Sequence, residues 1–240
     1  SILLMGFLSY TYSQNIQNDS IQKNKFNYKA IIIPTVLIGY GVIGIESDQI
    51  KYFNSEIKEE LQENIDEKIT IDDFSQYLPA DSFYGLNAFG IKGKHNFKER
   101  TIILGTSYLL VTTTVLSLKN TTKVERPDGS ANNSFPSGHT ATAFAGAEFL
   151  WQEYKDQSIW YGISGYLVAS GTGLFRMYND RHWLTDVAAG AGIGILSTKV
   201  AYWLYPKINK LLFKKKHNTK VATLPFYNGK QIGVGLSCSF

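Results

Sequence analysis

The chain has almost no cysteine and little excess charge. Its 240 residues include one cysteine, Cys238, so no disulfide can form within the chain. The formal net charge is only +4, and a stretch near the C-terminus carries much of the excess at Lys207, Lys210, Lys214, Lys215, Lys216 and Lys220. That stretch lacks the interleaved aromatic residues on which bases stack, so we expect no nucleic-acid partner and assign it to a flank at a membrane surface.

The length and the absence of an internal linker predict a single domain over residues 15–220. Residues 1–14 have no initiator methionine and turn polar by Gln14, which resembles the end of a secretory signal peptide; a short buried segment is the alternative. Residues 221–240 form two β-rich runs around Asn228-Gly229, which predicts either a terminal hairpin or a disordered tail.

Apolar segments alternate with polar turns through the rest of the chain. An uncharged run at 30–45 is followed by Phe53, Ile57, Leu61 and Ile65, whose spacing predicts an amphipathic helix. The later segments cover residues 101–118, 140–150, 159–175 and 187–198. We therefore predict an all-α fold, a helix bundle in which successive helices run antiparallel.

Polar residues suited to a phosphate site recur at the ends of these segments. In chain order they are Lys119, Arg126, Ser137, Gly138, His139, Arg176, His182 and Asp186. In an antiparallel bundle all of them fall at one end. The three cations would meet the charge that spreads over a phosphoryl group in transfer, and the free N–H groups of a helix beginning at Ser137-Gly138 would bind its oxygens.

Two histidines divide the chemistry between them. His182 and Asp186 are four positions apart, which on a helix places the carboxylate against one ring nitrogen and leaves the other as a nucleophile. His139 would protonate the leaving oxygen and then activate water. Because the cations neutralise the phosphate, we expect no metal and no cofactor. Each residue taken singly has a simpler explanation, such as a capped helix start at Ser137. The occurrence of all of them in one ordered pattern favours a phosphate site instead.

These stretches resemble the three signature motifs of the type 2 phosphatidic acid phosphatase (PAP2) superfamily, which includes class A acid phosphatases and vanadium haloperoxidases. The third motif departs from the usual pattern, because Phe175 stands where a serine normally precedes Arg176. The resemblance covers residues 119–186 and implies a PAP2/haloperoxidase-type bundle with its site at one end. It also implies a phosphohistidine on His182 and vanadate as a phosphate-mimicking inhibitor.

The same resemblance implies a phosphorylated lipid as substrate: phosphatidic acid, phosphatidylglycerol phosphate, undecaprenyl diphosphate or lipid A. Two alternatives stay open, a soluble periplasmic acid phosphatase of broad range and a vanadate-dependent haloperoxidase. The loop 178–181 either forms the rim of the pocket or is a plain connection. His95 and His217 lie in polar, lysine-rich stretches, and we expect both to be exposed and outside the site.

Two arrangements relative to a membrane fit the sequence. Basic residues lie at the ends of the helices away from the site, a positive-inside pattern that favours a membrane-spanning bundle with an outward-facing site; besides the lysine stretch they are Lys92, Lys94, Lys98 and Arg100. Most segments, however, fall short of the ~20 apolar residues that a span requires, and the mean hydropathy is only −0.13. We therefore expect a protein of the bacterial cell envelope, either integral to the membrane with a periplasm-facing site or soluble in the periplasm.

Overall fold

A computed structural model describes residues 28–63, 70–213, 220–227 and 230–239. The predictions made for residues 1–14, Ile65, His217 and the Asn228-Gly229 turn lie outside these ranges. A short 3-10 helix at Tyr28–Ile31 leads into α1 (Ile32–Glu46), α2 (Asp48–Gln62), α3 (Asp72–Ser75), α4 (Leu78–Ala88), α5 (Phe97–Thr122), α6 (Gly138–Tyr154), α7 (Ile159–Tyr178) and α8 (Leu184–Leu212). Strands β1 (Lys220–Tyr227) and β2 (Ile232–Ser239) follow.

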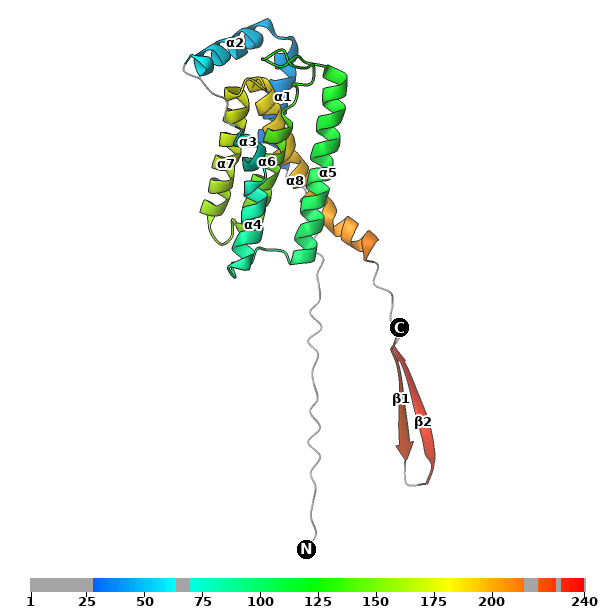
Figure 1. Ribbon diagram of the computed structural model, residues 1–240. Helices are drawn as coiled ribbons and strands as arrows, with labels where there is room; N and C mark the ends of the chain where they lie inside the picture. The colour runs from blue at the N-terminus through cyan, green and yellow to red at the C-terminus, as the bar shows by residue number, and fades with distance from the viewer. Residues whose placement is uncertain (1–27, 64–69, 214–219, 228–229, 240) are drawn as a thin grey trace.

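The helices form a bundle around α6 and α8 (Figure 1). The helix α6 packs against α4, α5, α7 and α8, and α8 also contacts α1 and α5. The helix α2 lies across one end of the bundle. The prediction of an all-α bundle is confirmed. Most of the helices are longer than the apolar runs that indicated them.

Small residues let α8 approach two neighbours closely. A Cβ atom added at Gly190 would lie 2.5 Å from the Ser137 carbonyl oxygen at the start of α6, and one at Gly192 would lie 2.6 Å from the Pro34 carbonyl oxygen on α1. Backbones packed this closely bring the starts of α6 and α8 together.

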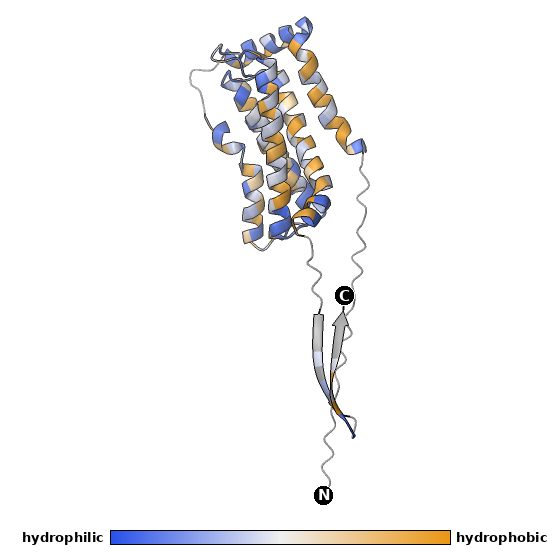
Figure 2. Cartoon of the chain, turned by 90° about the vertical axis from the view of Figure 1, so that its right-hand side faces the viewer, coloured by the Kyte–Doolittle hydropathy of each residue, from blue (hydrophilic) through white to orange (hydrophobic). Residues whose placement is uncertain are grey.

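Among the residues that the structure describes, three helices are long and apolar enough to cross a membrane. They are Tyr28–Glu46, Phe97–Thr122 and Leu184–Leu212, with mean hydropathies of 1.7, 1.6 and 1.3. Hydrophilic residues gather toward the two ends of the bundle (Figure 2). Large apolar side chains in the middle of α5 and α7, such as Leu109 and Leu167, are exposed. The integral-membrane alternative is therefore confirmed. The apolar runs in the sequence were shorter than the helices, because α5 and α8 continue past the lysines that end those runs.

The terminal hairpin is also confirmed. Strands β1 and β2 pair antiparallel, with Tyr227 opposite Ile232. They lie apart from the helical bundle (Figure 1).

The expectation that His95 is exposed is wrong. Its Nδ1 lies 2.7 Å from Oε1 of Glu153, its backbone N–H donates to Oε2 at 2.9 Å, and its ring packs against Tyr202 and Tyr205. Glu153 has a fully buried side chain, and a buried carboxylate needs such partners. His95 therefore stabilises the end of the bundle remote from α2.

Candidate active site

The residues expected to form a phosphate site do come from one end of the bundle. Lys119 is in the last turn of α5, and Arg176 is in the last turn of α7. Ser137 caps the start of α6, Asp186 is in the first turn of α8, and Arg126 and His182 lie on the connecting loops. This is the end that α2 covers (Figure 1).

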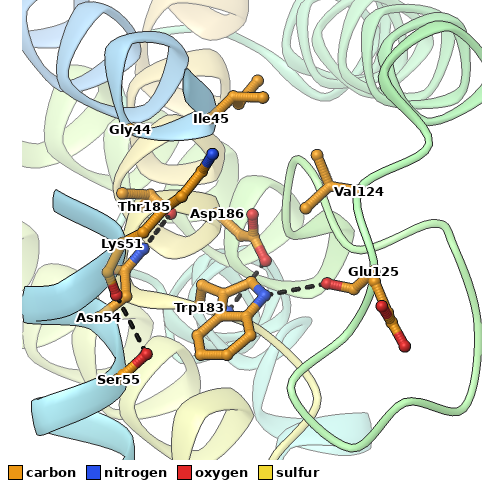
Figure 3. Close-up of a pocket in the computed structure, with 10 residues that line it drawn as sticks. All are labelled: Gly44, Ile45, Lys51, Asn54, Ser55, Val124, Glu125, Trp183, Thr185 and Asp186. Atoms are coloured by element: carbon orange, nitrogen blue, oxygen red, sulfur yellow. Dashed lines mark hydrogen bonds between the residues drawn. The ribbon is translucent and has the colours of Figure 1, made fainter. Parts of the chain in front are cut away.

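His182 does not share a helix with Asp186, contrary to the expectation, because α8 begins two residues later at Leu184. The pair forms nevertheless: His182 Nδ1 lies 3.5 Å from Asp186 Oδ2. The Asp186 carboxylate also accepts the Trp183 backbone N–H at 2.9 Å, which caps α8 (Figure 3). The carboxylate that orients the histidine thus also begins the helix behind it.

Ser134 is a further partner that the sequence did not indicate. Its hydroxyl donates to Asp186 Oδ2 at 2.5 Å and lies 3.4 Å from His182 Nδ1. All three side chains are buried. With Nδ1 facing Asp186, the Nε2 of His182 is left to carry the lone pair.

The surroundings of His182 favour its neutral form. Burial lowers its pKa to about 4, Lys119 and Arg176 act in the same direction, and Asp186 opposes them. A neutral imidazole at pH 7 is the form that attacks phosphorus.

The cations converge on the same region. Arg126 Nε donates to Asn133 Oδ1 at 2.8 Å, and Lys119 Nζ donates to the backbone carbonyls of Asn133 and Ser134. Burial lowers the pKa of Arg126, and the nearby Arg176 and Arg181 lower it further. Such mutual repulsion between cations is relieved when an anion binds among them.

A cavity of about 380 Å³ opens beside these cations. Its lining consists almost entirely of charged and polar residues: Thr70, Asp72, Asp73, Arg126, His139, Arg176, Asn179 and Arg181. Two members of the loop 178–181 are among them, so that loop does form part of the rim. His182 lies deeper, against a crevice beneath α2 that it shares with Lys58 and Met177.

A second cavity, of about 370 Å³, lies on the Trp183 side of Asp186. Figure 3 shows the ends of α1 and α2 on one side of it and Val124 and Glu125 on the other. The Trp183 indole N–H donates to the Glu125 carbonyl oxygen at 2.9 Å and so forms part of its floor.

Ser137 and Gly138 begin α6 at the site. The Ser137 backbone N–H donates to the Asp186 carbonyl oxygen at 3.0 Å, and its hydroxyl lies 2.8 Å from the Thr140 hydroxyl. The Ser137 side chain is fully buried. Its hydroxyl therefore caps the helix in this state, and contact of Ser137 and Gly138 with phosphate stays a prediction.

Two aspartates on α3 complete the site, and the sequence motifs did not indicate them. Asp72 forms a buried ion pair with Arg176 Nη1 and accepts from Asn179 Nδ2 at 2.9 Å. Asp73 Oδ1 lies 3.1 Å from His139 Nε2 and 3.8 Å from Arg176 Nη1.

Atoms of Asp72, Asp73 and His139 that are able to bind a metal lie within 4.8 Å of one another. The guanidinium of Arg176 already lies beside both carboxylates, and its positive charge opposes a second cation at the same place. The arrangement therefore fits an arginine counterion better than a metal centre.

Comparison with known proteins gives a family. Residues 100–210 match the profile of the PAP2 superfamily. The chain is 40% identical over 148 residues to a protein of Porphyromonas gingivalis named lipid A 1-phosphatase, and the match covers 60% of this chain and 32% of that protein. It is 35% identical over 78 residues to the bacitracin transport permease protein BcrC of Bacillus licheniformis, which covers 32% of this chain and 36% of that one. The chain thus spans about a third of the length of each relative.

Two crystal structures are also similar. LpxE of Aquifex aeolicus is 26% identical with a TM-score of 0.48, and the match covers 62% of this chain and 94% of that one. A transmembrane PAP2-type phosphatidylglycerolphosphate phosphatase from Bacillus subtilis is 24% identical with a TM-score of 0.49, covering 73% of this chain and 97% of that one.

The profile match covers all the motif residues and runs from the first turn of α5 to the last turn of α8. The three candidate membrane-spanning helices agree with an integral membrane protein of the cell envelope. Over residues 100–210 the chain is therefore similar to the PAP2 superfamily.

Proposed function

We propose that the chain is a phosphatase that removes a phosphate group from a lipid through a phosphohistidine on His182. The observation that carries the proposal is the neutral, buried His182, oriented by Asp186 beside three converging cations. This arrangement suits attack on a phosphoryl group that the protein has fixed and neutralised without a metal ion.

In the first step, Nε2 of His182 attacks phosphorus and the bond between phosphorus and the leaving oxygen breaks. Asp186 stabilises the positive charge that develops on the ring, as the carboxylate of a catalytic triad does. Arg126 and Arg176 bind the equatorial oxygens, and Lys119 adds a further positive charge. His139 protonates the leaving oxygen, so the dephosphorylated lipid departs as a neutral alcohol or a shorter phosphate.

In the second step, a water molecule attacks the phosphohistidine. His139, now neutral, accepts a proton from this water, the bond between phosphorus and nitrogen breaks, and His182 returns to its neutral form. Inorganic phosphate leaves and His139 is ready to act as an acid again. One residue thus serves both half-reactions.

Two observations support a lipid substrate. In the described part of the chain, three helices are apolar enough to cross a membrane, and in such an arrangement the polar cavity would lie near lipid headgroups. The relative at 40% identity bears the name lipid A 1-phosphatase, so lipid A is the first substrate to test among the lipid phosphates.

Phosphate release from the detergent-purified full chain tests the function. The panel comprises lipid A, phosphatidic acid, phosphatidylglycerol phosphate, undecaprenyl diphosphate and an aryl phosphate, each with a chelator and with or without vanadate. We expect chelator-resistant, vanadate-sensitive release, greatest for lipid A. His182→Ala should lose both release and an acid-labile phosphoenzyme, whereas His95→Gln, at the opposite end of the bundle, should retain them.

The other results each favour a different function. Equal turnover of the aryl phosphate and the lipids would favour an acid phosphatase of broad range. Halide oxidation by peroxide after vanadate loading, without phosphate release, would favour a haloperoxidase. A phosphoenzyme that persists in His182→Ala would overturn the assignment of the nucleophile.

A further inference from the structure

The short helix α3 brings a carboxylate to the leaving-group acid. Asp73 Oδ1 lies 3.1 Å from Nε2 of His139, although the two residues are 66 positions apart. The side chain of His139 is 29% exposed and that of Asp73 is 54% exposed, so both face the polar cavity.

Two contacts on successive turns fasten α3 against α7. The Ser75 hydroxyl lies 2.7 Å from the Thr172 hydroxyl, and Asp72 pairs with Arg176 one helical turn further along α7. Thr172 and Asp72 are both buried. Asp73 is thus presented to His139 by a segment that is held in place at two points.

The other charges around His139 are mixed. Arg176 on α7 faces it, and Arg126 and Arg181 line the same cavity from the loops, whereas Asp72 and Asp73 come from α3. Burial and then Arg176 lower the pKa of His139, while the hydrogen bond that its ring donates to Asp73 and the charges of both aspartates raise it. A general acid has to carry a proton before substrate arrives, and burial and the nearby Arg176 oppose that state.

We propose that Asp73 is a positioning residue that accepts the Nε2 proton of His139, orients the ring and stabilises its protonated form, so that the other ring nitrogen, Nδ1, donates the proton to the leaving oxygen. The inference rests on the proposed phosphatase function for its catalytic meaning, but the pairing itself can be measured without turnover. Asp73 acts through His139 and makes no contact with the phosphate in this scheme.

Titration of the His139 ring by NMR, in the full chain with isotope-labelled histidine, is the first test. The chain has four histidines, and His139→Gln assigns the signal. In Asp73→Asn, which keeps the shape but removes the charge, we expect the titration midpoint to fall by about 1 pH unit, as for loss of a nearby opposite charge. Asp73→Glu should keep the His139 midpoint closer to the wild-type value than Asp73→Asn does. Asp81 is an exposed aspartate on α4, and Asp81→Asn should leave the midpoint unchanged.

Phosphate release provides the second readout. With His139 as acid, activity is lost as pH rises through its pKa, so in Asp73→Asn the alkaline limb of the pH profile should move to lower pH. The loss in kcat should be at least tenfold greater for a lipid phosphate than for an aryl phosphate, whose leaving group needs little protonation.

The outcomes separate the two proposals. No phosphate release by the wild-type chain would refute the proposed function, and the NMR titration would still test the pairing. An unchanged His139 titration in Asp73→Asn would overturn the role of Asp73 even in an active enzyme. A shifted titration with equal losses on lipid and aryl phosphates would overturn the catalytic part, because a purely structural effect slows both alike.

Discussion

Gly190 lies where α8 meets the start of α6, and replacing it with alanine tests how the site is assembled. The new Cβ would lie 2.5 Å from the Ser137 carbonyl oxygen and 3.2 Å from Thr140 Cβ, whereas ordinary contacts begin at 3.4 Å. That carbonyl oxygen also accepts the Ala141 backbone N–H at 3.0 Å within α6. The backbone of α6 therefore has to move away from α8 by about 1 Å.

The displacement should affect activity more than stability. Forcing an extra carbon into a packed interface lowers the free energy of unfolding by about 1–3 kcal/mol. The better helix propensity of alanine raises it by up to about 1 kcal/mol. The net loss of stability is therefore about 1 kcal/mol. His139 follows Ser137 on α6, however, and Asp186 lies one turn before Gly190 on α8, so the two histidines separate. A misplacement of about 1 Å can reduce turnover by about 100-fold.

The matched control is Gly171→Ala on α7, where nothing lies within 4 Å of the added Cβ. We would measure thermal unfolding in detergent and phosphate release for both variants. Gly171→Ala should keep its activity with equal or greater stability, whereas Gly190→Ala should be folded and about 100-fold slower. Wild-type turnover in Gly190→Ala would refute the argument that the close contact sets the geometry of the site.

Three further predictions concern ionisable groups. The folded-state pKa of His182, about 4, lies below its ordinary value of 6.5, so the stability it contributes is present above pH 6.5 and is lost as pH falls toward 4. The loss should reach about 3 kcal/mol in thermal unfolding series and be absent in His182→Gln. Asp186→Asn should lower kcat by about 10³- to 10⁴-fold with little change in KM, because the carboxylate no longer stabilises the charged ring. Glu148 is buried, and its Oε1 accepts from Lys199 Nζ at 2.6 Å. Glu148→Leu should lower the free energy of unfolding by about 3 kcal/mol because it leaves the lysine unpaired. Adding Lys199→Met to that variant should restore part of the lost stability.

Each of these has an outcome that would contradict it. A wild-type stability that is flat between pH 7 and 4 would mean that His182 is solvated. A tenfold or smaller effect of Asp186→Asn would show that Ser134 or Trp183 orients the histidine without the carboxylate. Equal stability of the single and double variants at Glu148 and Lys199 would show that the two charges are not coupled.

The sequence predicted the elements and motif residues that follow local rules. Apolar runs bounded by polar turns indicated α5 to α8, and the alternation of their directions placed Lys119 and Arg176 at the same end. The Asn-Gly pair indicated the hairpin. These features depend on neighbours within a few positions, which a single sequence displays.

The features that the sequence did not indicate depend on contacts between distant segments. Asp73 meets His139 across 66 positions, and Ser134 meets Asp186 across 52, so no spacing rule connects them. His95 looked like a surface residue because its partner Glu153 lies 58 positions away. The helical placement of His182 failed for a local reason: Asp186 accepts the Trp183 backbone N–H and thereby starts α8 after the histidine.

Asp186 shows why motif residues so far apart in sequence make one site. Its carboxylate caps α8, accepts from Ser134 and faces His182, while its backbone carbonyl accepts the Ser137 N–H at the start of α6. One residue thus joins two helix starts, His182 and a loop. Because Gly190 lets the same two helices touch one turn later, close backbone contacts set the spacing between the segments that carry His139 and His182. A site built in this way is preorganised, which is what stabilisation of a transferring phosphoryl group requires.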